Sequence, residues 1–176
     1  MSLRPISTLR VSKHMIPAFE LFPNCSIQNK PLLIYHSVFK KPISPAKVES
    51  HLASVGIVSP QWRYTMYNFD HFHTTSHEVL CITQGRARVC FGAKENKARV
   101  EIVVESGDAV VVPAGVAHSL QEDLDGDFQM VGSYPNGSTF DMCYGKPGEE
   151  DKVANVKSLE WFQYDPIYGG HGPATE

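Results

Sequence analysis

The sequence has no long hydrophobic run. Its first twenty residues, MSLRPISTLRVSKHMIPAFE, mix charged residues and prolines in every window, so they lack the apolar centre of a signal peptide. No later stretch approaches the length that spans a bilayer. We therefore expect no membrane partner and a cytoplasmic location.

An excess of positive charge is also missing. The chain has 16 Lys and Arg against 19 Asp and Glu, a net charge of −3, and a pI near 6.2. The basic residues are scattered rather than clustered, so the sequence offers no broad basic surface for a phosphate backbone. This composition argues against a nucleic-acid partner.

The cysteines show no metal-finger or redox spacing. Cys25, Cys81, Cys90 and Cys143 form no C-x-x-C pair. A chain of 176 residues with 42% hydrophobic residues can bury a core without crosslinks, so we expect free thiols. No repeat or low-complexity segment divides the chain, which predicts one domain over residues 1–176.

The most informative residues present are histidines in the stretch HFHTTSHEVLCITQG. His71 and His73 are two residues apart, so on an extended strand their rings leave the same face. Glu78 can return to that side after a short turn. Gln84-Gly85 then reads as a turn that begins a hairpin.

A second stretch, GDAVVVPAGVAHSLQE, complements the first. A turn at Gly107 precedes a β-branched strand, and another turn at Pro113 and Gly115 leads to His118. Antiparallel pairing of the two stretches would place His118 opposite His71 and His73. The sequence therefore predicts one site made of three imidazoles and one carboxylate.

This ligand set suits a divalent transition metal (Fe, Mn, Ni, Cu or Zn) better than calcium or magnesium, and does not choose among the five. Four protein ligands would leave an octahedral metal two open positions for a small-molecule substrate, or for a substrate and dioxygen. His77 precedes Glu78 and points to the other face of a regular strand, so whether it also binds the metal stays open.

The two stretches resemble the two cupin motifs, G(x)5HxH(x)3–4E(x)6G and G(x)5PxG(x)2H(x)3N. Two positions depart from them: Thr65 stands where the first motif begins with Gly, and Glu122 stands where the second ends with Asn. By this resemblance, His71, His73, Glu78 and His118 correspond to the metal ligands of cupins. The departures affect a local turn and the surroundings of the ligands, but remove no ligand.

Longer segments resemble recurring blocks of the YjlB-like family of bacterial and fungal cupins. They include WRYTMYNFDHFHTTSHEVL, FGAKENKARVEIVVESGDAVVVPAGVAH and YDPIYGGHGP. The resemblance implies an all-β, single-domain cupin, which is a double-stranded β-helix or jelly-roll barrel, with a barrel core over about residues 60–145. It also implies a bound metal and a homodimer, but no particular reaction.

A short N-terminal helix is expected beside the barrel. The segment PLLIYHSVF reads as a strand, and Ser44-Pro45 then provides an N-cap and a first-turn proline. Gly56 is a plausible C-cap. Near the other end, EWFQYDPIYGGHGP is too aromatic for a free tail, so we expect it to pack on the barrel or on a second subunit.

Residues beside the expected ligands are candidates for a substrate pocket. On alternating strands the pocket walls would be Tyr67, Phe69, Leu80, Ile82 and Tyr64. The Tyr64 and Tyr67 hydroxyls could face a substrate or simply accompany packed rings. His36, on an apolar strand, is either a pocket residue or a hydrogen-bonded core histidine.

Glu122 is the candidate for a supporting carboxylate or base. On a regular strand His118, Leu120 and Glu122 share a face, so Glu122 could orient a ligand or accept a proton. A solvated surface carboxylate is the alternative.

The pattern as a whole favours a metal-dependent enzyme that oxidises an oxygen-bearing metabolite, in a dioxygenase-type reaction. Metal-assisted isomerisation is the nearest alternative, because cupins with this ligand set include both kinds of enzyme. A metal or metabolite-binding protein without turnover is the alternative from another class. Access to the metal distinguishes an enzyme from a protein without turnover, because an enzyme needs an exchangeable metal position beside a pocket.

Overall fold

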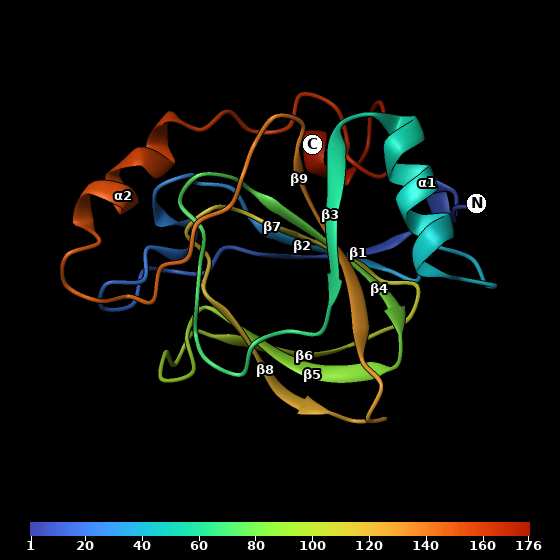
Figure 1. Cartoon of the computed structure of the whole chain (residues 1–176). Coiled ribbons are helices and arrows are strands. Elements are labelled where there is room, and N and C mark those ends of the chain that lie inside the picture. The colour runs from blue at the N-terminus through green and yellow to red at the C-terminus, as the bar shows by residue number, and fades with distance from the viewer.

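Two antiparallel β-sheets face each other in the structure, a computed structural model that describes residues 1–176 (Figure 1). The larger sheet has the strand order β1-β2-β7-β4-β9-β3, and the smaller has the order β6-β5-β8. The strands are β1 Arg10–His14, β2 Leu32–His36, β3 Val58–Tyr64, β4 Glu78–Gln84, β5 Arg86–Phe91, β6 Val100–Glu105, β7 Ala109–Val112, β8 His118–Asp123 and β9 Gln129–Pro135. Mostly β, with antiparallel sheets, is the fold class that the sequence predicts.

Helices are few and lie outside the sheets. The α-helices are α1 Pro45–Val55 and α2 Glu150–Ala154, and the 3-10 helices are η1 Ile6–Thr8, η2 Asn24–Ser26, η3 Asn155–Ser158 and η4 Pro173–Thr175. No helix is both long and apolar enough to pass through a membrane.

The central strands are apolar on both faces. In β4, Leu80 and Ile82 point between the two sheets, while Val79 and Cys81 point to the outer side of the large sheet. Both sides are buried, so β4 reads as an almost continuous apolar run instead of an alternating one. The large sheet therefore lies between the two largest hydrophobic cores.

The inner core fills the space between the sheets. Its side chains come from both sheets, and include Leu32, Ile34, Leu80, Ile82, Val89, Phe91, Val104, Val110, Val112 and Met130. The outer core lies beneath α1 and the C-terminal segment, and includes Leu33, Tyr35, Val48, Leu52, Val79, Val111, Val131, Phe162 and Ile167. Each layer fixes the position of the large sheet from one side.

The turn at Gly85 does not form the predicted hairpin. Gly85 has φ 74°, and a Cβ there would lie 2.5 Å from the Asp127 carboxylate, so glycine is required. However, β4 pairs with β7 and β9, while β5 pairs with β6 and β8. The chain thus crosses from one sheet to the other at Gly85, because both edges of β4 already have partners.

The predicted opposition of the two histidine stretches is present. His71 and His118 form an antiparallel bridge, in which each backbone N–H donates to the other carbonyl at 3.2 and 2.9 Å. This bridge brings the segment between β3 and β4 onto the start of β8.

Helix α1 has the caps that the sequence predicts, but it is not N-terminal. The Ser44 hydroxyl accepts from the Lys47 N–H at 3.3 Å, and Gly56 ends the helix with φ 77°. The chain begins instead with η1 and β1, and β2 also precedes α1. The helix is formed by the predicted residues, but the prediction that it is N-terminal is wrong. The residues before it complete the large sheet, which therefore also contains strands from before residue 60.

The aromatic C-terminal segment packs back on the large sheet, as Figure 1 shows in red. Asp165 holds it there and is fully buried. One Asp165 oxygen accepts from the Tyr35 hydroxyl at 2.6 Å and the Ala174 N–H at 3.1 Å. The other accepts from the Ile167 and Tyr168 N–H groups. One carboxylate thus links the tail to β2.

The four cysteines are buried free thiols. Burial raises the pKa of Cys81 and of Cys90, the latter to about 11, so the thiolate is disfavoured at neutral pH. They act as small apolar core residues.

Replacement of Asp165 tests the tail's attachment. Asp165→Asn places an NH₂ group among four hydrogen-bond donors, so we expect the free energy of unfolding to fall by about 2–4 kcal/mol. Tyr35→Phe removes one of these donors and leaves three, so we expect the free energy of unfolding to fall by about 1 kcal/mol. Urea unfolding followed by tryptophan fluorescence measures both. Equal losses in the two variants would contradict the central role of the carboxylate.

Candidate metal centre

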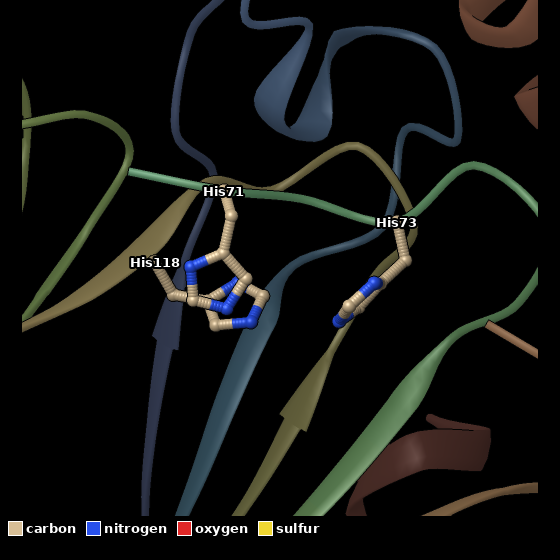
Figure 2. A group of neighbouring side chains, drawn as sticks. All are labelled: His71, His73 and His118. Carbon is tan, nitrogen blue, oxygen red and sulfur yellow. The ribbon is translucent and has the colours of Figure 1, made fainter. Parts of the chain in front are cut away.

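Three buried histidines converge at one end of the inner core. His71 and His73 lie between β3 and β4, and His118 is the first residue of β8. Their side chains are 5%, 5% and 2% exposed, and one nitrogen of each lies within 4.8 Å of the others. Figure 2 shows the ring of His73 turned toward those of His71 and His118. This cluster can hold a metal ion.

Backbone carbonyls fix the tautomer of each ring. The Nδ1 atoms lie 2.9 Å from the Phe69 carbonyl for His71, 3.0 Å from the Val116 carbonyl for His118, and 2.5 Å from the Asp141 carbonyl for His73. A carbonyl only accepts, so each Nδ1 carries the hydrogen. Each neutral ring then presents the Nε2 lone pair, which is the form that binds metals.

Glu78 completes the group from the first position of β4. Its Oε2 atom lies 3.2 Å from Nε2 of His73 and 3.2 Å from Nε2 of His118. With neutral rings, lone pairs would face a carboxylate and no hydrogen would stand between them. A cation at their centre satisfies all of these atoms, so the residues fit a divalent transition metal.

The electrostatics of the cluster show the same need for positive charge. Burial favours the neutral acid, but His73 and His118 hold the pKa of Glu78 well below its usual value. For His73, burial opposes the charge, but the Glu78 carboxylate outweighs it and raises the pKa. Burial and the neighbouring His118 lower the pKa of His71 to about 3.

A hydrogen-bonded chain fixes the second oxygen of Glu78. The Tyr134 hydroxyl donates to Glu78 Oε1 at 3.0 Å and accepts from Trp62 Nε1 at 2.8 Å. Tyr134 is fully buried on β9, and Trp62 lies on β3. Oε2 is thereby left to face the histidines.

The hydrogen-bonded chain from Trp62 through Tyr134 to Glu78 depends on a glycine. Trp62 lies against Gly132 so closely that a Cβ there would be 2.0 Å from the indole ring. Trp62 and Tyr134 were not predicted from the sequence, because they come from strands outside both motifs. A glycine inside a strand pattern was the available signal, since it often marks a close approach of another group.

Asp141 supports His73 from a segment that the motifs also omit. Its carboxylate accepts from the Thr74 N–H at 2.6 Å and from the Thr74 hydroxyl at 2.5 Å, while its carbonyl accepts from His73. These contacts hold the Asp141 segment against the loop that carries the ligands.

A cavity of about 270 Å³ opens beside the cluster. It is lined by the four residues of the cluster together with Trp62, Arg63, Tyr64, Thr65, Met66, Tyr67, Leu80, Met130, Tyr134, Phe140 and Met142. Tyr64, Tyr67 and Leu80 thus lie where the sequence predicts, with the two tyrosine rings half-exposed at the mouth.

Three other predicted pocket residues are not in its lining. Ile82 is buried deeper in the inner core. Phe69 stacks on Tyr67 outside the cavity, with ring centres 5.0 Å apart, and its carbonyl holds His71. His36 is at the end of β2 and bonds Ser12 Oγ at 2.7 Å, so it is a hydrogen-bonded structural histidine.

Glu122 lies outside the barrel. A bulge between the pairs Val89–Leu120 and Arg88–Glu122 adds one residue to β8, which turns Glu122 away from the face of His118. Its side chain is 55% exposed and pairs with Arg88 at 2.5 Å. The structure therefore does not bring Glu122 to the site, because the strand is not regular as the prediction assumed.

His77 faces away from the cluster. Its Nδ1 accepts from the Ala114 N–H at 3.0 Å, and its Nε2 donates to the Glu160 carbonyl at 3.0 Å. Both nitrogens are used, and the ring packs on Trp161. His77 is a structural residue that ties β4 to the C-terminal segment.

His77 makes stability depend on pH. Burial lowers the pKa of His77 to about 4, so the unfolded chain takes up a proton at higher pH than the folded chain does. The wild type should therefore lose up to about 3 kcal/mol through this residue as pH falls from about 6.5 to about 4. His77→Gln keeps a donor and an acceptor but does not titrate. Urea unfolding of both proteins across this range measures the difference, and parallel curves would contradict it.

Tyr134 should control metal affinity through Glu78. Tyr134→Phe removes the donor to Oε1 and leaves the indole N–H of Trp62 without its acceptor, so we expect about tenfold weaker binding of Zn²⁺ or Mn²⁺. Competition with a coloured chelator measures this. Tyr144→Phe, an exposed ring on the same side, is the matched control and should bind as the wild type does. Equal affinity in the two variants would mean that Tyr134 only packs.

Known proteins resemble this chain in sequence and structure. Residues 67–132 match the Cupin family. The uncharacterized protein YjlB of Bacillus subtilis (strain 168) is 38% identical over 119 residues, which cover 67% of this chain and 70% of the relative.

Solved structures give weaker matches. Procruciferin, the 11S globulin of Brassica napus, has 15% identity and a TM-score of 0.34, over 62% of this chain and 22% of the globulin. The plu4264 protein of Photorhabdus luminescens has 12% identity and a TM-score of 0.31, over 89% of this chain and 88% of that protein. The chain thus spans about a fifth of the globulin.

The sequence match to YjlB shows the family of this chain. Both histidine stretches lie within the residues that match the Cupin family. The chain belongs to the cupin family, among the YjlB-like cupins.

Proposed function

We propose that this cupin is a metal-dependent enzyme that oxidises a small oxygen-bearing molecule with dioxygen. One observation carries the proposal: the side chains of His71, His73 and His118 converge in the lining of an open cavity, with the Glu78 carboxylate beside two of them. A purely structural metal is usually enclosed by protein ligands. This cluster instead borders a space for a substrate.

His71, His73 and His118 would hold the metal through Nε2, with Glu78 beside them. When bound, a divalent transition metal (Fe, Mn, Ni, Cu or Zn) supplies a Lewis acid for a substrate oxygen, and Fe, Mn, Ni or Cu also a centre for dioxygen chemistry. The protein contributes the rigid arrangement. The carbonyls behind the rings and the Trp62–Tyr134 chain behind Glu78 keep the donors in place.

The cavity walls orient the substrate and exclude water. Phe140 stacks on Tyr134 with ring centres 5.0 Å apart and contacts His73 edge-on at 5.5 Å. Leu80 and Met130 close the inner end. A flat substrate would lie among these side chains with its oxygen atoms toward the histidines.

The proposed reaction balances without a further reductant. In an enolised substrate the carbon–carbon double bond breaks, and each of its two carbons gains one oxygen atom from O₂ as a carbonyl. The four electrons of that double bond reduce the O₂ molecule, and both oxygen atoms end in the product.

The cavity gives less support to an isomerase. Moving a proton between two substrate carbons needs a free acceptor beside the substrate. The only carboxylate in the lining is Glu78, which faces the histidines, and Glu122 lies outside. Cytoplasmic location and homodimer formation stay predictions from the sequence.

Metal analysis and oxygen uptake test the proposal. Purified without metal-affinity chromatography, the wild type should carry about one transition metal per chain, as should His77→Gln, while His73→Ala should lose most of it. After anaerobic iron loading, an oxygen electrode should record uptake with enol or catechol-like compounds by the first two proteins only. Equal metal content in all three proteins would contradict the assignment of the metal centre. Metal without uptake would favour isomerisation or binding alone.

A further inference from the structure

The cavity is lined mostly by apolar side chains and contains no free lysine or arginine. Its apolar residues include Trp62, Met66, Leu80, Met130, Phe140 and Met142. The one Lys or Arg in the lining, Arg63, is held by both oxygens of Glu49 at 2.6 and 2.8 Å. A second negative charge on a ligand would therefore have no partner inside the cavity.

The charge of the metal centre, which belongs to the proposed function, also limits the charge that a ligand can carry. Three neutral histidines and one carboxylate around a divalent ion leave a single positive charge. One ionised oxygen neutralises it, whereas a dianion would bring excess negative charge into an apolar space. The cavity volume of about 270 Å³ is enough for one substituted ring or a short conjugated chain.

Thr65 provides an unused hydrogen-bonding group at this place. It follows β3 and lines the cavity, and its hydroxyl is buried without any partner in the protein. Buried hydroxyls normally have a partner. A change of χ1 rotamer moves the hydroxyl to a neighbouring staggered position, so the hydroxyl can turn to a bound molecule. Thr65 is also the residue that stands in place of the first glycine of the cupin motif.

From these features we infer that the cavity binds a planar, largely apolar molecule with one ionised oxygen, of the phenolate or enolate type. The ionised oxygen goes to the metal centre, and Thr65 donates a hydrogen bond to an oxygen of the same molecule. Dicarboxylates are excluded by charge, and Thr65 acts as a specificity residue that the cupin motif itself does not provide.

The test uses protein loaded with Zn²⁺, which has no redox chemistry and so separates binding from turnover. Calorimetry measures the binding of 4-nitrophenol, which has one hydroxyl and is a planar monoanion at mildly alkaline pH, and of oxalate, a small dianion. The variants are Thr65→Val, which keeps the shape of threonine without its hydroxyl, and Thr65→Ser, which keeps the hydroxyl. Thr65→Ala replaces the first if valine prevents folding. Zinc content and thermal midpoint are recorded for each protein.

We expect 4-nitrophenol to bind at least about tenfold more tightly than oxalate. Thr65→Val should weaken its binding about tenfold, and Thr65→Ser should stay within about threefold of the wild type, all at equal zinc content. Oxalate that binds as tightly as 4-nitrophenol would overturn the ligand class. An unchanged affinity in Thr65→Val and Thr65→Ala would overturn the role of Thr65. Wild-type protein that holds no zinc would instead refute the proposed metal centre.

Discussion

The candidate site depends on hydrogen bonds from imidazole rings to backbone carbonyls. Because His71, His73 and His118 each donate from Nδ1 to a carbonyl, their Nε2 lone pairs stay available to a ligand, and those of His73 and His118 face the Glu78 carboxylate. Such an arrangement is unfavourable without positive charge at its centre. The carbonyls belong to ordered backbone, so the site is already arranged before any ligand arrives.

The two-layered core makes that backbone rigid. Inner and outer cores press on the large sheet from both sides, and the C-terminal segment is fastened through Asp165. Residues that carry no chemistry thereby hold the ligands in place. His77 shows this well, since it connects the turn at Ala114 with Glu160 in the C-terminal segment while the neighbouring Glu78 faces the metal ligands.

Strand irregularity explains where prediction from alternation failed. Glu122 was expected beside His118, but one extra residue in β8 reverses its direction. Alternation correctly predicted that Leu80 and Ile82 lie on the same face of β4. However, their positions along the barrel differ, so only Leu80 lines the cavity. Bulges and depth depend on how sheets pack, and local sequence does not encode them directly.

The sequence by itself determined the family, the mostly β fold and the histidine cluster, because short spacings such as His71-x-His73 and the turn before His118 act locally along strands. Only the tertiary structure decided the surroundings of that cluster. Trp62, Tyr134 and Asp141 come from separate segments, and their contacts with the ligands arise when the sheets close and the loops fold over the mouth. Long-range packing sets these contacts, so the sequence could at most signal a close approach at Gly132 and not which side chain makes it.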